Sequence, residues 1–160
     1  MDILDFAIQM EKDGEAYYRE IAEGTKDKGM KNIFTMLADE EVKHAEVLNE
    51  MKSGAPEPGE TKVLSDVKNI FARMREEKEH PDIDTSQVDM YRKALELEGK
   101  SKDFYLEKSN EVEDLLQKGW LLKLADEESK HYFILENIIE FVSRPDTWLE
   151  NSEFVHLEDY

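Results

Sequence analysis

Apolar residues recur at intervals of three and four along most of the chain, the spacing that places them on one face of an α-helix. One such stretch runs from about residue 2 to 23 and a second from about 26 to 52, with Gly24 at the break between them. The second stretch stops at SGAPEPG (53–59), whose two prolines and two glycines cannot continue a helix. The pattern predicts a helical hairpin over residues 2–52.

The same spacing returns in the second half of the chain, after a long connection. Residues 53 to about 85 hold one shorter amphipathic segment, from 63 to 74. A third helix is predicted from about 86 to 110 and a fourth from about 111 to 143, where a proline follows. Three consecutive residues are candidates for the N-cap of the third helix: Asp84, Thr85 and Ser86. The tail is predicted to dock on the bundle, as a short C-terminal helix or an irregular segment, through Trp148, Leu149, Phe154 and Val155.

The composition supports long helices joined by few turns. Charged residues make up 38% of the chain and aromatic residues 9%, and there are only 7 Gly and 4 Pro among 160 residues. A chain of this length fits one domain with its own core. We therefore predict an all-α fold in a single domain over residues 1–160, built from two helical hairpins at about 2–52 and 86–143.

The chain contains an internal repeat with an offset of 87 residues. The segment LADEEVKH (37–44) matches LADEESKH (124–131) at seven of eight positions, and the same offset aligns the first and third helices. A helical hairpin is therefore used twice, and each copy carries two glutamates and one histidine in equivalent places. These residues are Glu11, Glu41 and His44 in one copy and Glu98, Glu128 and His131 in the other.

These six residues are predicted to lie at one height along the bundle. Glu11 and Glu41 average to position 26, inside the first turn, so in an antiparallel hairpin both lie about 22 Å from the turn at ~1.5 Å per residue. Glu98 and Glu128 average to 113, near the second turn, which gives the same height. All six side chains can meet if the two turns lie at opposite ends. The long connection after the second helix allows the crossover that this requires, so we predict an antiparallel four-helix bundle with a crossover between its second and third helices.

Acidic side chains on the apolar faces of these helices indicate bound cations. A lone Glu-x-x-His is usually incidental, but Glu41 and His44 share a face with leucine and alanine residues. Ionised carboxylates in an apolar core would cost roughly several kcal/mol each unless cations compensate them. The nearby lysines lie on other faces: Lys12, Lys43 and Lys130. Two divalent ions would cancel the four charges, and carboxylates with imidazoles suit iron or manganese best, with zinc tolerated.

Two tyrosines lie close to the predicted ligands. Tyr18 and Tyr105 follow Glu11 and Glu98 by two helical turns and lie on the same faces. They are predicted either to hydrogen-bond the ligand carboxylates and shield the metals, or to pack in the core. The sequence leaves both roles open.

Charge and cysteine content exclude several classes of function. The formal net charge of −18 repels polyphosphates and anionic lipids, so we expect neither nucleic acid nor a membrane as a partner. The absence of cysteine excludes disulfides, thiolate metal sites and iron–sulfur clusters. No run approaches ~20 apolar residues, and no basic region followed by an apolar stretch opens the chain, so we expect a cytoplasmic protein.

The chain resembles the rubrerythrin branch of the ferritin-like diiron-carboxylate superfamily over nearly its whole length. The string IFTMLADEEVKHAE (33–46) is similar to the second helix of that family, and the duplicated site makes the resemblance specific. The resemblance implies a ferritin-like bundle that holds two iron ions bridged by Glu41 and Glu128. Each ion would also have one terminal glutamate and one histidine, and these ligands would be Glu11, Glu98, His44 and His131.

The chain departs from the family pattern at two points. Rubrerythrins carry an additional iron domain with four cysteines, and this chain has no cysteine, so electrons would come from a separate donor protein. The family also has a further glutamate ligand three residues after the one matching Glu98, and here that position is Ser101. The resemblance further implies a homodimer of two bundles.

Three functions fit these features. The first is an oxidoreductase that reduces peroxide or O2, or oxidises Fe(II), at a dinuclear centre. The second is iron binding or storage without catalytic turnover, and the third is a structural bundle with a vestigial site. Metal content separates the third function from the other two, and peroxide consumption measured against iron uptake separates the first from the second.

Overall fold

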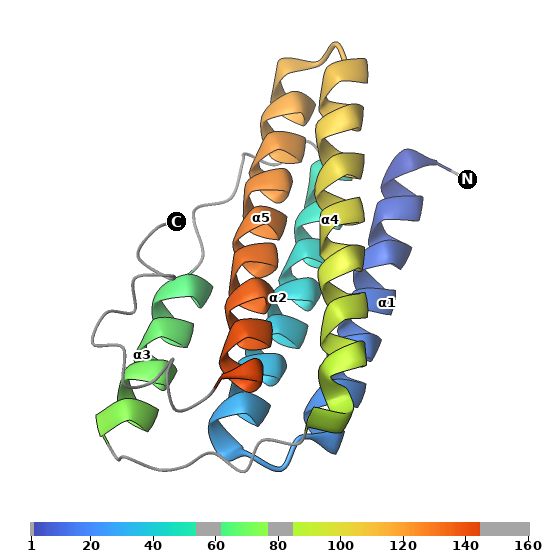
Figure 1. The fold of residues 1–160 in the computed structure, drawn as a ribbon. Coiled ribbons are helices and arrows are strands. Elements are labelled where there is room, and N and C mark those ends of the chain that lie inside the picture. The colour runs from blue at the N-terminus through green and yellow to red at the C-terminus, as the bar shows by residue number, and fades with distance from the viewer. Residues whose placement is uncertain (1, 54–61, 77–84, 145–160) are drawn as a thin grey trace.

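The computed structural model of the chain describes residues 2–53, 62–76 and 85–144, and within them it is helical with no strand. This confirms the predicted all-α bundle (Figure 1). None of the described helices is long and apolar enough to span a membrane. The predicted C-terminal tail, with Trp148 and Phe154, lies outside the described residues. The elements are α1 (Ile3–Gly24), α2 (Lys28–Lys52), α3 (Val63–Glu76), the 3-10 helix η1 (Thr85–Gln87), α4 (Val88–Glu111) and α5 (Leu115–Ser143).

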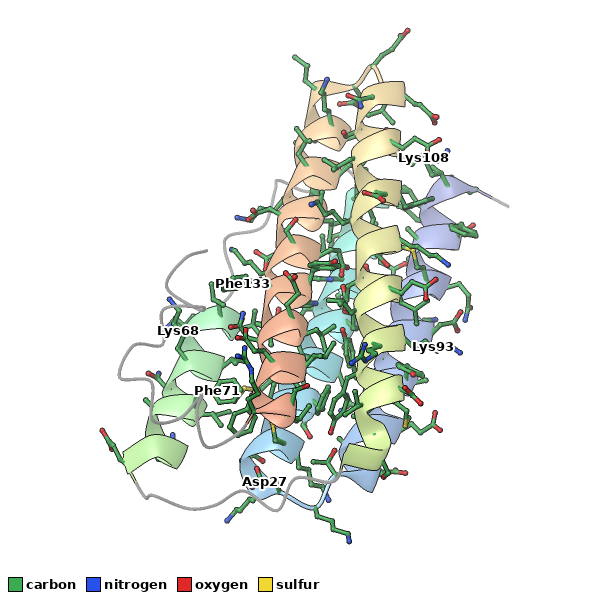
Figure 2. All side chains as sticks on the ribbon, viewed as in Figure 1. Asp27, Lys68, Phe71, Lys93, Lys108 and Phe133 are labelled. Atoms are coloured by element: carbon green, nitrogen blue, oxygen red, sulfur yellow. The ribbon has the colours of Figure 1, made fainter. Side chains whose placement is uncertain are left out.

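The four long helices form two antiparallel hairpins, α1 with α2 and α4 with α5. The turn of the first hairpin lies at the bottom of Figure 1 and the turn of the second at the top. The chain therefore crosses the length of the bundle between α2 and α4, as predicted, and α3 lies in this crossover beside α2 and α5 (Figure 1). The Phe71 ring of α3 packs edge-on against Phe141 of α5, with ring centroids 5.3 Å apart (Figure 2).

An aspartate caps the second helix of each hairpin. Asp27, labelled at the first turn in Figure 2, precedes α2, and its Oδ1 accepts a hydrogen bond of 2.9 Å from the backbone N–H of Met30. Asp114 precedes α5 and accepts a bond of 2.8 Å from the N–H of Leu116. The prediction that the fourth helix begins near residue 111 was wrong, because α4 ends there and the cap starts the next helix at Leu115.

The start of α4 also differs from the prediction. Thr85 belongs to η1 together with Ser86, and the N-cap is Gln87, whose side chain makes no capping bond. Asp84, the third predicted cap, lies outside the described residues. The Gln87 side chain instead accepts a hydrogen bond of 3.0 Å from the Thr25 hydroxyl and donates to the Ile21 carbonyl. Gln87 therefore ties the start of α4 to the end of α1.

The apolar core is divided into two clusters along the bundle. One contains Ile33 and Phe34 of α2 with side chains of α3, and the other contains Leu48 of α2 with Trp120 of α5. On every long helix the six predicted ligands fall between residues of the first cluster and residues of the second. A layer of acids and imidazoles therefore interrupts the core at mid-height.

Candidate metal centre

The structure buries all six predicted ligand side chains and brings them together. None is more than 4% exposed. The hairpins contribute equally, because one glutamate comes from each of α1 and α4, and a glutamate with a histidine one turn later comes from each of α2 and α5. In chain order these residues are Glu11, Glu41, His44, Glu98, Glu128 and His131.

The six side chains form two overlapping groups. The first consists of Glu11, Glu41, His44 and Glu128, and the second of Glu41, Glu98, Glu128 and His131. In each group one donor atom per residue lies within 4.8 Å of the others. Glu41 and Glu128 belong to both groups, so the arrangement offers two adjacent cation positions that share two carboxylates.

Each histidine faces carboxylates through its Nδ1 atom. His44 Nδ1 lies 3.2 Å from Glu128 Oε1 and 3.4 Å from Glu11 Oε2. His131 Nδ1 lies 3.2 Å from Glu41 Oε1 and 3.6 Å from Glu98 Oε1. The two imidazole rings stack on each other with centroids 5.3 Å apart. The closest carboxylate to each histidine therefore belongs to the other hairpin.

The two tyrosines whose role the sequence left open hydrogen-bond carboxylates of the cluster. The Tyr18 hydroxyl donates to Glu98 Oε1, and the Tyr105 hydroxyl donates to Glu11 Oε1. Both rings are also buried among core residues. Burial raises the pKa of both phenols well above the ordinary value, and the neighbouring carboxylates Glu98 and Glu11 raise it further, so both keep their protons. Each tyrosine orients a carboxylate of the opposite hairpin.

The two shared carboxyls favour the protonated state in the metal-free cluster. Burial raises the pKa of Glu41 well above 4.5, and repulsion from Glu11 and Glu98 adds to this. Burial likewise raises the pKa of Glu128, with repulsion from Glu11 and Glu41 as the next causes. Without a cation between the helices, these two side chains therefore hold protons.

The two unshared carboxyls favour the ionised state. Burial alone would raise the pKa of Glu11, but the attraction of His44 and hydrogen bonds from Glu41 and Glu128 bring it below the ordinary range. Burial also opposes ionisation of Glu98, and a hydrogen bond from Glu128 and the attraction of His131 lower its pKa. Burial lowers the pKa of His44, but Glu11 more than compensates and the net shift is upward. In the metal-free cluster the negative charge is therefore reduced by the protons on Glu41 and Glu128, and bound cations could take over this role.

The donor atoms fit a pair of cations. Among the described residues, the buried side-chain atoms without a hydrogen-bond partner include the Oε2 atoms of Glu11, Glu98 and Glu128. Unpaired buried polar atoms are rare in folded proteins, because leaving them unpaired costs free energy. Carboxylate oxygens and imidazole nitrogens without thiolates are the donor set of iron and manganese sites.

Two further buried carboxylates were not predicted from the sequence. Glu40 and Glu127 precede the shared glutamates by one residue and are only 5% and 3% exposed. Lys43 Nζ lies 3.3 Å from Glu40 Oε1, and Lys130 Nζ lies 3.4 Å from Glu127 Oε1. A carboxylate oxygen of Glu40 also lies within 4.8 Å of a ring nitrogen of both histidines. Both carboxylates fall inside the repeated octapeptide, which is the signal that could have identified them.

A cavity of about 420 Å³ reaches the cluster between α1 and α4. Glu41 and Glu98 of the cluster are among the residues that line it. Gly14 of α1 keeps this space open, because a Cβ atom there would lie 3.1 Å from Glu41 Oε2. The sequence did not predict the cavity, since it is formed by side chains that lie far apart in the chain.

The chain is similar to known proteins over most of its length. Its sequence matches the model of the family described as Rubrerythrin over residues 2–139. Among solved structures, it is similar to a hypothetical protein from Pyrococcus furiosus, with a TM-score of 0.65, 23% sequence identity and 89% of each chain covered. At this identity the likeness shows a shared fold. No curated protein matches the chain.

Proposed function

Because the chain belongs to the rubrerythrin family, we propose that its buried carboxylate and histidine cluster holds two iron ions. Glu41 and Glu128 would be shared between the ions. The remaining donors divide evenly, with Glu11 and His44 on one ion and Glu98 and His131 on the other. Manganese would also suit these donors, and zinc would be tolerated.

The observation that carries this proposal is the overlap of the two donor groups. Each group has three carboxylates and one imidazole, and both contain Glu41 and Glu128. A single cation would leave the histidine and the unshared carboxylate of the other group without a metal ion. Two divalent cations would balance the four carboxylates and so compensate the burial and the mutual repulsion that otherwise raise the pKa values of Glu41 and Glu128.

We propose that the protein uses this centre to reduce hydrogen peroxide or O2. Reduction of one peroxide consumes two electrons and two protons and yields two waters. Bound iron would supply the reversible change of oxidation state. The chain has no cysteine, so the electrons would come from a separate donor protein.

The protein side chains would have two tasks in this reaction. Tyr18 and Tyr105 would hold the carboxylates of Glu98 and Glu11 in fixed orientations, because their raised pKa values keep both hydroxyls as donors. Glu41 would release its proton as a cation binds, as would Glu128, so metal loading and proton release would be coupled.

Metal content tests the first part of the proposal. Metal-free protein reconstituted with Fe(II) under anaerobic conditions is expected to retain about two iron ions per chain after desalting, the content of a dinuclear carboxylate site in a helical bundle. Elemental analysis measures this directly. A content well under one ion per chain would remove both the catalytic and the storage function and leave a structural bundle with a vestigial site.

Stopped-flow kinetics test the second part. The iron-loaded protein, supplied with a reductant, is expected to consume peroxide over many turnovers, whereas the metal-free protein serves as the control. Uptake of tens of irons per chain with no sustained peroxide consumption would instead support iron storage. A centre that binds two irons but neither turns over nor accumulates iron would contradict both functions.

A further inference from the structure

The cavity between α1 and α4 lies beside one of the two cation positions of the centre. Its lining includes Glu41, which both donor groups share, and Glu98, which belongs to the second group alone. The donors that belong to the first group alone, Glu11 and His44, are not among the described residues that line it. A molecule in the cavity would therefore lie next to the cation position of Glu98 and His131.

The cavity is larger than peroxide or O2 requires. Its volume is about 420 Å³, whereas a water molecule occupies about 30 Å³ of the liquid. Pockets that hold organic molecules in proteins begin at about 300 Å³. The space can therefore take an organic molecule of several carbon atoms.

Most of the surface that lines the cavity is apolar. Met10 and the rings of Tyr17 and Tyr18 line it from α1, and Ala94 and Leu97 line it from α4. An apolar ligand would replace water along these side chains, which is favourable because apolar surface is removed from water on both sides of the contact.

The tyrosine hydroxyls at the cavity already have acceptors within the protein. The Tyr17 hydroxyl donates a hydrogen bond of 3.1 Å to a backbone carbonyl of α4, and the Tyr18 hydroxyl donates to Glu98. Each hydroxyl has a single proton to donate. A polar ligand would therefore find neither of these donors available, and the two rings offer it mainly their apolar surface.

The charges that line the cavity do not select an ion of either sign. Asp13 accepts a hydrogen bond of 2.9 Å from a glutamine of its own helix, and Lys100 pairs with Glu96 at 3.0 Å. Lys93, labelled on α4 in Figure 2, is the other lining lysine. These two lysines and two acids cancel in charge, and bound cations would compensate the two lining glutamates of the metal centre. The iron-loaded protein therefore offers an ionised ligand no net counter-charge here.

We propose that this cavity binds a neutral organic molecule with an apolar body, next to the cation position of Glu98 and His131. An ionised molecule would lose hydration on entering and gain no free partner in return, whereas a neutral apolar one gains from leaving water. The proposal deepens the proposed function, on which the placement next to a metal ion rests, because it assigns an organic ligand to the same centre.

Three probes with the same six-carbon chain test the class of ligand: hexan-1-ol, hexanoate and hexylammonium. Isothermal titration of the iron-loaded protein is expected to show saturable binding of hexan-1-ol, and at least severalfold weaker binding of the two ions, because their charged groups must lose water. Absence of saturable hexan-1-ol binding would overturn the site. Binding of either ion as tightly as hexan-1-ol, or more tightly, would overturn the neutral class.

A pair of leucine variants tests the location. Leu97→Asp places a charge on the apolar lining and should weaken hexan-1-ol binding at least tenfold. Leu106→Asp is the matched control, because Leu106 is exposed to a similar extent (37% against 40%), lies about half a turn round α4 and is not among the lining residues. It should bind like the unaltered protein. An unchanged affinity of Leu97→Asp, or equal losses in the two variants, would overturn the assignment to this cavity.

The same titration of metal-free protein, with iron content measured in parallel, separates this proposal from the previous one. Hexan-1-ol binding that depends on Leu97, in a protein that fails to retain iron, would support the cavity and reject the metal centre. Retention of two irons without saturable hexan-1-ol binding would support the metal centre and reject the organic ligand.

Discussion

The two hairpins carry the same residue types where they meet at the metal centre but different ones where α1 and α4 border the cavity. Residues 37–44 and 124–131 differ at one of eight positions. At the cavity, Gly14 of α1 corresponds to Ser101 of α4, and a Cβ atom at position 14 would lie 3.1 Å from Glu41 Oε2. Both hairpins contribute the same buried acids and imidazoles, so the need to compensate the charge of these acids limits the sequence of both copies in the same way. The cavity, by contrast, is built once, from unlike residues of the two copies.

The largest effect is expected from comparing shared with unshared carboxylates. Glu41→Ala and Glu128→Ala each remove a donor from both cation positions and should abolish binding of both ions. Glu11→Ala and Glu98→Ala each remove a donor from one position and should leave about one ion per chain, because the other group keeps its four donors. Elemental analysis after iron reconstitution measures the difference.

Glu46→Ala is a control for these four variants, because Glu46 is an exposed residue of α2 and should retain the full metal content. Glu41→Ala also removes a buried carboxyl that has to take up a proton in the metal-free protein, so at neutral pH the metal-free variant is expected to be at least as stable as the parent. If the shared and unshared variants lost equal amounts of iron, the assignment of Glu41 and Glu128 to both ions would be wrong.

A smaller effect is expected on the stability of the metal-free protein as the pH changes. The raised pKa values of Glu41 and Glu128 mean that their contribution to the free energy of unfolding is complete below pH 4.5 and is lost as the pH rises through their folded-state values. Each proton contributes up to about 1.4 kcal/mol per pH unit in that range. Glu11 and Glu98 have lowered values, so their contribution is fully present above pH 4.5 and does not offset this loss.

Urea unfolding in the presence of a chelator checks this pH dependence. The unfolding midpoint should fall as the pH is raised from about 5 to 8. The single variants Glu41→Gln and Glu128→Gln should each reduce the slope by a similar amount, because the two residues occupy equivalent places in the hairpins. A midpoint that rises with pH over this range would show that the shared carboxyls are already ionised in the metal-free protein.

The smallest effect is expected at the pair of positions that distinguishes the hairpins at the cavity. Gly14→Ala places a methyl group against Glu41 and should weaken iron binding severalfold. In the metal-free protein the better helix propensity of alanine, up to about 1 kcal/mol, is opposed by the displacement of Glu41, so a small net change in stability is expected. Ser101→Ala should leave iron affinity unchanged. Competition with a chromogenic chelator measures affinity, and thermal unfolding of metal-free protein measures stability. Equal iron affinity of both variants would show that Glu41 moves aside at no cost.

The sequence predicted the fold and the meeting of the six side chains, because both depend on regular features of helices. Apolar spacing marks the helices, and a constant rise per residue gives the heights of Glu11 and Glu41 relative to their turn. The repeat then carries the same reasoning to the second hairpin. These quantities are local to each hairpin, so they can be read without knowing how the hairpins pack.

The features that the sequence did not predict depend on contacts between distant segments. Gln87 replaces the expected caps of α4 because its side chain bonds Thr25 and the Ile21 carbonyl at the end of α1. The burial of Glu40 and Glu127 depends on how the helices pack around them, which the spacing along a single helix does not give. Asp114 could have been found, because it lies 87 residues after Asp27 and caps the equivalent helix.

At the centre, the tyrosine hydroxyls and the histidine rings contact carboxylates of the opposite hairpin. Each such contact has a counterpart, which is obtained by replacing both residues with their equivalents 87 positions away. Tyr18 reaches Glu98 as Tyr105 reaches Glu11, and the closest carboxylate contacts of the two histidines obey the same rule. This is the reciprocity of a twofold symmetric dimer contained within a single polypeptide. In each half of the chain, the tyrosine and the histidine therefore find these carboxylate partners only in the other half. The α3 segment, which links the halves, supplies none of these partners. If the centre holds iron as we propose, iron retention would report whether the two halves have come together.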